Sequence, residues 1–220
     1  MPPPTPPNPA RVHVFIDGQN LFYSVNRQFG YGFPNYDVLK LAAFVTKLEV
    51  NRVLGKVHFY TGLHDRAEDP FWHEFWSKKL LAMQHGGVHT VWRPLKYADI
   101  QVPTPSGGTR TIRRGREKGI DIRLALDLVG LARRKEYDVA IIFSVDTDLF
   151  EAVHEVYEIR QELGTWLKVE CAFPAGGAGR PLRGIDKTQW RKIDKAAYDL
   201  CIDPADYRPS PATPSAPPPP

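Results

Sequence analysis

The chain has 220 residues, 42% of them hydrophobic and 25% charged, which is typical of one soluble globular domain. No stretch approaches the roughly 18 apolar residues of a membrane span, and the first ten residues lack the basic and apolar segments of a signal peptide. The only cysteines, Cys171 and Cys201, argue against a disulfide framework and favour a cytoplasmic location.

Predicted strands and helices alternate along the chain. In order, we expect a strand over 11–16, a helix beginning within 21–25, a helix over 36–48, a strand over 56–61, a helix over 70–85, a strand over 88–93, a helix over 121–134, a strand over 138–144, a helix over 149–163, a strand over 166–173 and a helix over 187–201. The runs VHVFI and VAIIF are almost continuously apolar, as parallel strands covered on both faces are. The pattern predicts a doubly wound α/β sandwich of three layers with a mainly parallel, five-stranded sheet.

Both ends of the chain are rich in proline. Fourteen of the 21 prolines lie in residues 1–10 and 204–220, which lack core-forming residues. We therefore expect disordered or polyproline-II tails over 1–10 and 204–220, around one folded domain over 11–203.

Residues 94–117 interrupt the alternation. They are rich in turn formers, with short β-prone pieces around Ser106-Gly107-Gly108, and predict a protruding hairpin or a mobile loop. Within and just after them, RTIRRGREK (110–118) carries five bases and one acid, a charge of +4 that equals the net charge of the whole chain. Such a patch favours a polyanionic partner, although a solvated loop is the alternative.

Acidic residues follow the two most apolar predicted strands. Asp17 ends the first strand, and Asp146 and Asp148 follow the strand over 138–144, while Asp121 opens the helix after the basic segment. Because ligands of parallel α/β sheets bind at the carboxyl ends of the strands, we expect these four carboxylates to share one crevice. Protons or cations must offset their repulsion, and an oxygen-only ligand set favours Mg²⁺ or Mn²⁺ over zinc.

Each of these acids also has a structural explanation. Asp148 and Glu151 have the spacing of a helix N-cap followed by an acid at the third helical position. Asp121 suits a first helical turn, and Asp17 with Gly18 is a common turn pair. Capping alone does not explain why two strands both end in acids, nor why two acids stand one residue apart.

Three motifs occur in order along the chain: VFIDGQNLF, KGIDIRLALDLV and YDVAIIFSVDTDLFEAV. Together they resemble the NYN domain of the LabA-like group, which is related to PIN nucleases, and the resemblance covers nearly all of residues 11–203. It implies a PIN-like Rossmannoid sandwich with an acidic pocket for a divalent metal. It also implies ribonuclease activity, which several members of the family have.

The resemblance further implies roles for particular residues. Metal ligands would be Asp17, Asp121, Asp146 and Asp148, which with Asn20 would form the catalytic site. Ser144 matches the polar residue before the Asp-x-Asp pair, and Asp127 matches the helix pattern but lies about 600° beyond Asp121, so we expect a supporting or structural role there. The RNA backbone would be gripped electrostatically by Arg110, Arg113, Arg114, Arg116 and Lys118, which gives affinity but no sequence code.

Two further motifs have simpler explanations. FWHEFW (71–76) spaces its aromatic rings for one helix, so we expect core packing or a face for a homo-oligomer or protein partner along the helix over 70–85, ahead of base stacking. AGGAGR (175–180) could cradle a phosphate with Arg180 and Arg183, but it matches neither a Walker loop nor a GxGxxG motif, and a flexible connection is the better interpretation. The scattered histidines form no zinc motif.

The sequence thus predicts a metal-dependent ribonuclease, with RNA and not a membrane as partner. The alternative is a catalytically silent NYN-fold module that binds RNA or regulates a partner. A Mg²⁺-dependent phosphatase of the haloacid-dehalogenase type is disfavoured, because Gln19 stands where that class has the second acid after its first strand.

Overall fold

A computed structural model describes residues 4–105 and 107–209. Six strands of the described chain form one parallel sheet in the order β3-β2-β1-β6-β7-β8. Their bounds are β1 (Ala10–Asp17), β2 (Arg52–Leu63), β3 (His89–Pro94), β6 (Val139–Phe143), β7 (Lys168–Pro174) and β8 (Gln189–Ile193). The predicted α/β class with a mainly parallel sheet is confirmed.

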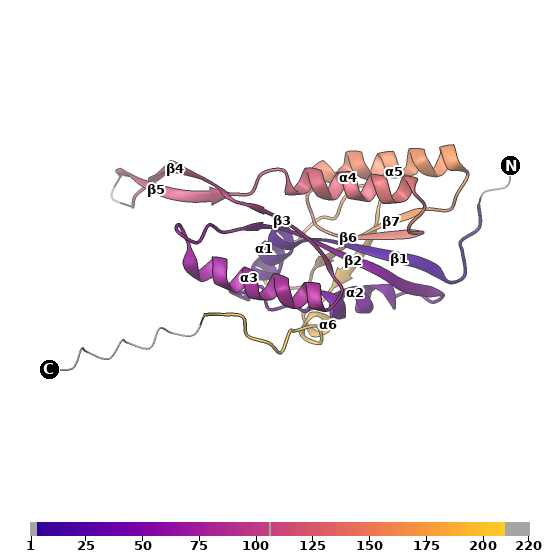
Figure 1. Ribbon diagram of the computed structural model, residues 1–220, viewed down its shortest axis with the longest axis horizontal. Helices are drawn as coiled ribbons and strands as arrows, with labels where there is room; N and C mark the ends of the chain where they lie inside the picture. The colour runs from indigo at the N-terminus through magenta and orange to yellow at the C-terminus, as the bar shows by residue number, and fades with distance from the viewer. Residues whose placement is uncertain (1–3, 106, 210–220) are drawn as a thin grey trace.

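Helices cover both faces of the sheet (Figure 1). One face carries α1 (Gly18–Phe29), α2 (Val38–Thr46), α3 (Pro70–His85) and α6 (Lys195–Asp199); the other carries α4 (Ile120–Arg133), the short 3-10 helix η1 (Thr147–Leu149) and α5 (Phe150–Leu163). Successive residues of β1 serve the two cores, because side chains alternate along a strand. Val14 and Ile16 pack under α1–α3, and Phe15 packs under α4.

The edge of the sheet corrects two predictions. The sheet of the described residues has six strands, one more than predicted, and residues 187–201 do not form a single helix. Their first part is β8, which pairs with β7 and brings Arg191 to Glu170, with an Nε–Oε2 distance of 2.7 Å. The helix begins only after Asp194, whose carboxylate accepts the N–H of Ala197 as an N-cap.

The predicted hairpin is confirmed. Strands β4 (Lys96–Pro103) and β5 (Thr109–Arg116) pair antiparallel as a separate two-stranded ribbon. The ribbon projects beyond the rest of the domain (Figure 1). The basic segment therefore lies on a defined β-ribbon that leads directly into α4.

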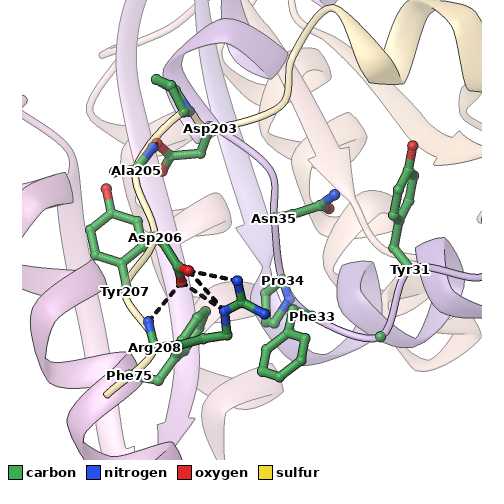
Figure 2. Close-up of a pocket in the computed structure, with 12 residues that line it drawn as sticks. Tyr31, Phe33, Pro34, Asn35, Phe75, Asp203, Ala205, Asp206, Tyr207 and Arg208 are labelled. Atoms are coloured by element: carbon green, nitrogen blue, oxygen red, sulfur yellow. Dashed lines mark hydrogen bonds and ion pairs between the residues drawn. The ribbon is translucent and has the colours of Figure 1, made fainter. Parts of the chain in front are cut away.

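The described part of the C-terminal segment packs against the domain (Figure 2). Buried Lys79 donates to Asp203 with an Nζ–Oδ2 distance of 3.1 Å, and the Tyr207 ring lies over the same ammonium group. A hollow of about 330 Å³ lies beside this segment, and Phe33, Phe75 and Tyr207 are among the residues that line it. Of the predicted disordered tails, residues 1–3 and 210–220 lie outside the described chain. No helix within 4–105 or 107–209 has the length and apolar character needed to cross a bilayer.

Candidate active site

The site lies where the strand order of the sheet reverses. From the neighbouring strands β1 and β6, the chain builds outward to β2 and β3 on one side and to β7 and β8 on the other. Open α/β sheets bind ligands at this switch point, beyond the carboxyl ends of the strands. Asp17 is the last residue of β1, and Asp146 follows the end of β6 by three residues.

Asp17 is buried and caps the helix that follows it. Its side-chain carboxylate accepts the N–H of Asn20 at 2.9 Å, so the predicted turn at Asp17-Gly18 is the N-cap of α1. Burial raises the pKa of Asp17 to about 6, the N–H of Asn20 opposes this shift, and the charges of Asp146 and Asp121 raise the pKa further. Asp17 thus shares an electrostatic environment with acids from two distant segments.

Asp146, and not Asp148, caps the helical segment after β6. The carboxylate of Asp146 accepts the N–H of Asp148 at 3.0 Å, and α5 itself begins at Phe150 without a side-chain cap. The capping explanation for Asp148 with Glu151 is therefore wrong. Asp148 is exposed on η1, two residues after the capping Asp146.

Asp121 lies in the first turn of α4, as predicted. It is exposed, and the N-cap position belongs to Gly119, which has a left-handed backbone with φ 75° and no side chain to donate or accept. The carboxylate of Asp121 therefore does not cap α4. Its charge acts on Asp17 and on a further acid, Glu117.

Glu117 is a site residue that sequence reasoning missed. Its carboxylate accepts the N–H of Gly62 at 2.7 Å, which links the base of the hairpin to the end of β2. Burial raises the pKa of Glu117 to about 7, and the charges of Asp17 and Asp121 also raise it. We call Asp17, Glu117, Asp121 and Asp146 the acidic cluster. The available signal was an acid four residues before Asp121, hidden within a strongly basic segment.

Asn20 and Ser144 hold the loop that carries Asp146. The side-chain oxygen of Asn20 accepts the N–H of Val145 at 3.0 Å, and the hydroxyl of Ser144 accepts the N–H of Asp146 at 3.1 Å. Behind them, the thiol of buried Cys171 donates to the carbonyl of Ser144 at 3.0 Å. These contacts fix the position of Asp146 relative to Asp17.

Asp127 has structural partners. It accepts the hydroxyl of Tyr60 at 3.0 Å and pairs with Arg123 one helical turn earlier at 2.6 Å. Tyr60 is the register partner of Asp17 on β2, so Asp127 braces the neighbouring strand through that phenol.

The predicted RNA-binding residues lie on β5 and just beyond it. Arg110, Arg113, Arg114 and Arg116 are on the strand, and Lys118 is exposed between Glu117 and α4. Arg113 forms ion pairs with Glu68 at 2.6 Å and with Asp99 at 3.4 Å. The basic segment therefore meets the acidic cluster at Glu117.

The remaining motifs pack within the fold. Phe75 and Trp76 are buried, which confirms the predicted core packing, and Phe71 is 37% exposed. A Cβ atom at Gly177 or Gly179 would collide with the carbonyl oxygens of Gln28 and Arg27 at the end of α1. These glycines thus permit close backbone packing without any need for a phosphate.

The acids fit the donor chemistry of a hard divalent cation, but they do not form a closed cage. In the described part of the chain, no three acid, histidine or cysteine side chains stand close enough together to hold one ion directly. The arrangement concentrates negative charge at the switch point, and a cation there would be held by fewer than three of these side chains directly and otherwise through water. Mg²⁺ is commonly bound in this way, through one or two carboxylates and several waters.

Comparisons with known proteins agree with the motifs. The sequence model of the NYN domain family matches residues 11–169. The "Low amplitude and bright protein LabA" of Synechococcus elongatus is 28% identical over 153 residues, 70% of this chain and 70% of that protein. A crystal structure of a protein of unknown function from Vibrio parahaemolyticus covers 87% of this chain and 97% of its own, with a TM-score of 0.52 and 17% identity, a likeness of fold alone. Because the family match spans well over half of its length, the chain belongs to the NYN domain family.

Proposed function

We propose that this NYN-domain protein is a metal-dependent ribonuclease that hydrolyses RNA phosphodiester bonds at the acidic cluster and Asp148. The observation that carries the proposal is the convergence of carboxylates from β1, the β5–α4 connection and the β6–η1 loop at the switch point of the sheet. Membership of a family related to PIN nucleases supports the reaction class. The adjacent basic hairpin supports a polyanionic substrate.

The donor set suits Mg²⁺ or Mn²⁺, since it consists of carboxylate oxygens that repel one another when no cation is present. Asp17, Asp121, Asp146 and Asp148 would hold the ion directly or through water, with Glu117 as an added carboxylate. When bound, such an ion supplies polarisation of a phosphodiester oxygen and a more acidic bound water.

The chain's own residues would hold the carboxylates in place. Asn20 and Ser144 fix the loop of Asp146, so that its carboxylate keeps one position relative to Asp17. The N–H of Gly62 holds the carboxylate of Glu117 at the end of β2. Positioning of this kind contributes to catalysis because the charges need no rearrangement during the reaction.

Cleavage of labelled single-stranded RNA tests the proposal. We expect cleavage to require added Mg²⁺ or Mn²⁺, and Asp146→Asn to reduce its rate by roughly 100- to 10,000-fold, the range over which removing a catalytic group acts. The asparagine retains an oxygen that can cap η1, so the substitution removes charge more than structure.

Asp186→Asn provides the matched control, because Asp186 is an exposed acid paired with Arg183 in another loop. It should cleave as the wild type does. Equal rates for Asp146→Asn and the wild type, or cleavage that persists in EDTA, would contradict the proposed mechanism.

A catalytically silent RNA-binding module is the second candidate. The open spacing of the acids favours it, because in the described residues no three metal-binding side chains are gathered around one point. RNA binding without metal-stimulated cleavage, across single-stranded, structured and duplex substrates, would support this candidate over the ribonuclease. A cytoplasmic location and a homo-oligomer or protein contact through the helix over 70–85 remain predictions beside either function.

A further inference from the structure

The hairpin β4–β5 has two chemically different faces. In its register, Lys96 pairs with Arg116, Ala98 with Arg114, Ile100 with Ile112 and Val102 with Arg110. Side chains of paired residues point to the same face of a β-ribbon, and successive residues alternate between faces. One face therefore carries four cations and no acid, and we call Lys96, Arg110, Arg114 and Arg116 the cationic face.

The opposite face is attached to the segment between β2 and α3. The hydroxyl of Tyr97 lies 3.3 Å from Nδ1 of His64, and Arg113 forms its ion pair with Glu68. At the base of the ribbon, the N–H of Leu95 donates to the carbonyl of Leu63 at 2.9 Å. These contacts fix the orientation of the ribbon and neutralise the one arginine on this side.

The cationic face has no such partners. All four of its side chains are exposed, and within the described residues none of them takes part in a hydrogen bond or ion pair. Between them lie the half-buried side chains of Ile100, Val102 and Ile112, against which the aliphatic parts of the arginines can rest. The cations are thus spaced along a paired β-ribbon without neutralisation.

We infer that the cationic face is a binding track for the phosphate backbone of single-stranded RNA and that Arg113 is not part of it. The inference rests on the proposed function and deepens it, because it separates a substrate track from a structural ion pair within one basic segment. Three of the four cations stand in single file on β5, where residues 110 and 116 are about 20 Å apart along the strand. A single file of charges matches one chain of phosphates, and it ends beside Glu117 at the edge of the acidic cluster.

The test is the salt dependence of RNA binding. Binding of a labelled single-stranded RNA is measured between low and moderate salt in the Asp146→Asn background, so that cleavage does not interfere. Each phosphate contact that is lost should reduce the slope of log K against log salt by about 0.7 for a single strand. We expect a reduction of about 0.7 for Arg114→Gln and about 2 for Arg110→Gln, Arg114→Gln and Arg116→Gln combined.

Arg113→Gln is the matched control, since Arg113 and Arg114 are adjacent identical residues on opposite faces. It should leave the slope unchanged, and circular dichroism melting should show that all variants fold. An unchanged slope in the triple variant, an equal reduction in Arg113→Gln, undetectable RNA binding, or an equal loss with duplex RNA would each overturn the inference.

This outcome is separable from the test of the ribonuclease. If Asp146→Asn abolishes cleavage but the triple variant keeps its salt slope, the track is wrong and the enzyme stands. If the triple variant loses its slope but no metal-stimulated cleavage occurs in the wild type, the track stands on a module that binds RNA without cutting it.

Discussion

Two carboxylates of the acidic cluster combine burial with a hydrogen bond from a backbone N–H. Asp17 accepts the N–H of Asn20, and Glu117 accepts the N–H of Gly62. Each hydrogen bond favours the charged form, while burial and neighbouring acids favour the neutral form. The pKa of each group rises because burial and repulsion outweigh the hydrogen bond.

Asp17→Asn should lower the pKa of Glu117 below its value of about 7, because the charge of Asp17 contributes to that shift. The asparagine can still accept the N–H of Asn20, so the start of α1 should be preserved. The measurement is a carbon-13 NMR titration of the glutamate carboxyl groups in metal-free buffer. Asp186→Asn should leave the titration unchanged, and an unaltered Glu117 in Asp17→Asn would show that the two carboxylates are not coupled.

The sequence could indicate most of these residues but not their full roles. Asp17, Asp146 and Asp148 follow apolar runs, and that pattern can be recognised from the neighbouring residues alone. Glu117 was missed because its burial depends on contact with Gly62, 55 residues earlier, on a different strand. The prediction of Asp148 as a helix N-cap was wrong, and Asp146 is the cap. The reason is that a short 3-10 helix precedes α5, so that α5 begins after Asp148.

At the scale of elements, prediction succeeded where one periodicity dominates. The buried strands and the longer helices were recognisable because each has a continuous apolar run or stripe. The segment over 187–201 failed because a five-residue edge strand and a five-residue helix share it. The strand conformation depends on backbone pairing with β7, which no local pattern reveals.

The connection over 175–180 offers a test of element packing. Gly177→Ala should destabilise the protein by about 1–3 kcal/mol, the usual effect of overpacking, because the new methyl group would meet the carbonyl of Gln28. Urea unfolding monitored by fluorescence gives the free energy of unfolding.

Gly32→Ala is the control for that substitution. A Cβ atom at Gly32 would meet no atom within 4 Å, so this change should be close to neutral. Equal stability of Gly177→Ala and the wild type would show that the connection is a flexible link, as the sequence suggested, and not a close-packed one.

Across the whole molecule, the two ends of the sheet differ in how their charges are balanced. The carboxyl ends of β1 and β6 gather acids that repel one another, whereas the opposite end of the sheet contains a compensated network. There, fully buried Glu170 accepts hydrogen bonds from Arg52 and Arg191 and forms an ion pair with Lys168 at 2.8 Å. Arg52 begins β2 and Lys168 begins β7, so this network joins strands on both sides of the switch point.

This network should control stability in acid. Burial alone would raise the pKa of Glu170, but hydrogen bonds from Arg191, Arg52 and Lys168 lower it to about 2, below the ordinary value of 4.5. A carboxyl group whose pKa is lower in the folded state than in the unfolded state stabilises the fold fully above the unfolded pKa. Its contribution should therefore be complete above about pH 4.5 and be lost as the pH falls toward 2.

Glu170→Gln should remove that part of the pH dependence and lower the free energy of unfolding at pH 7 by up to about 3–5 kcal/mol. The loss arises because Arg52 and Arg191 then keep only the partly exposed Glu49 as a counter-charge. Urea unfolding at several values between pH 7 and pH 3 measures both effects.

Glu158→Gln, which changes an exposed acid on α5, should retain the wild-type profile. If Glu170→Gln and the wild type lost stability in parallel as the pH fell, the acid sensitivity would arise from other carboxyl groups. Asp146→Asn should retain the wild-type stability profile below pH 4.5, since the site and this network occupy opposite ends of the sheet.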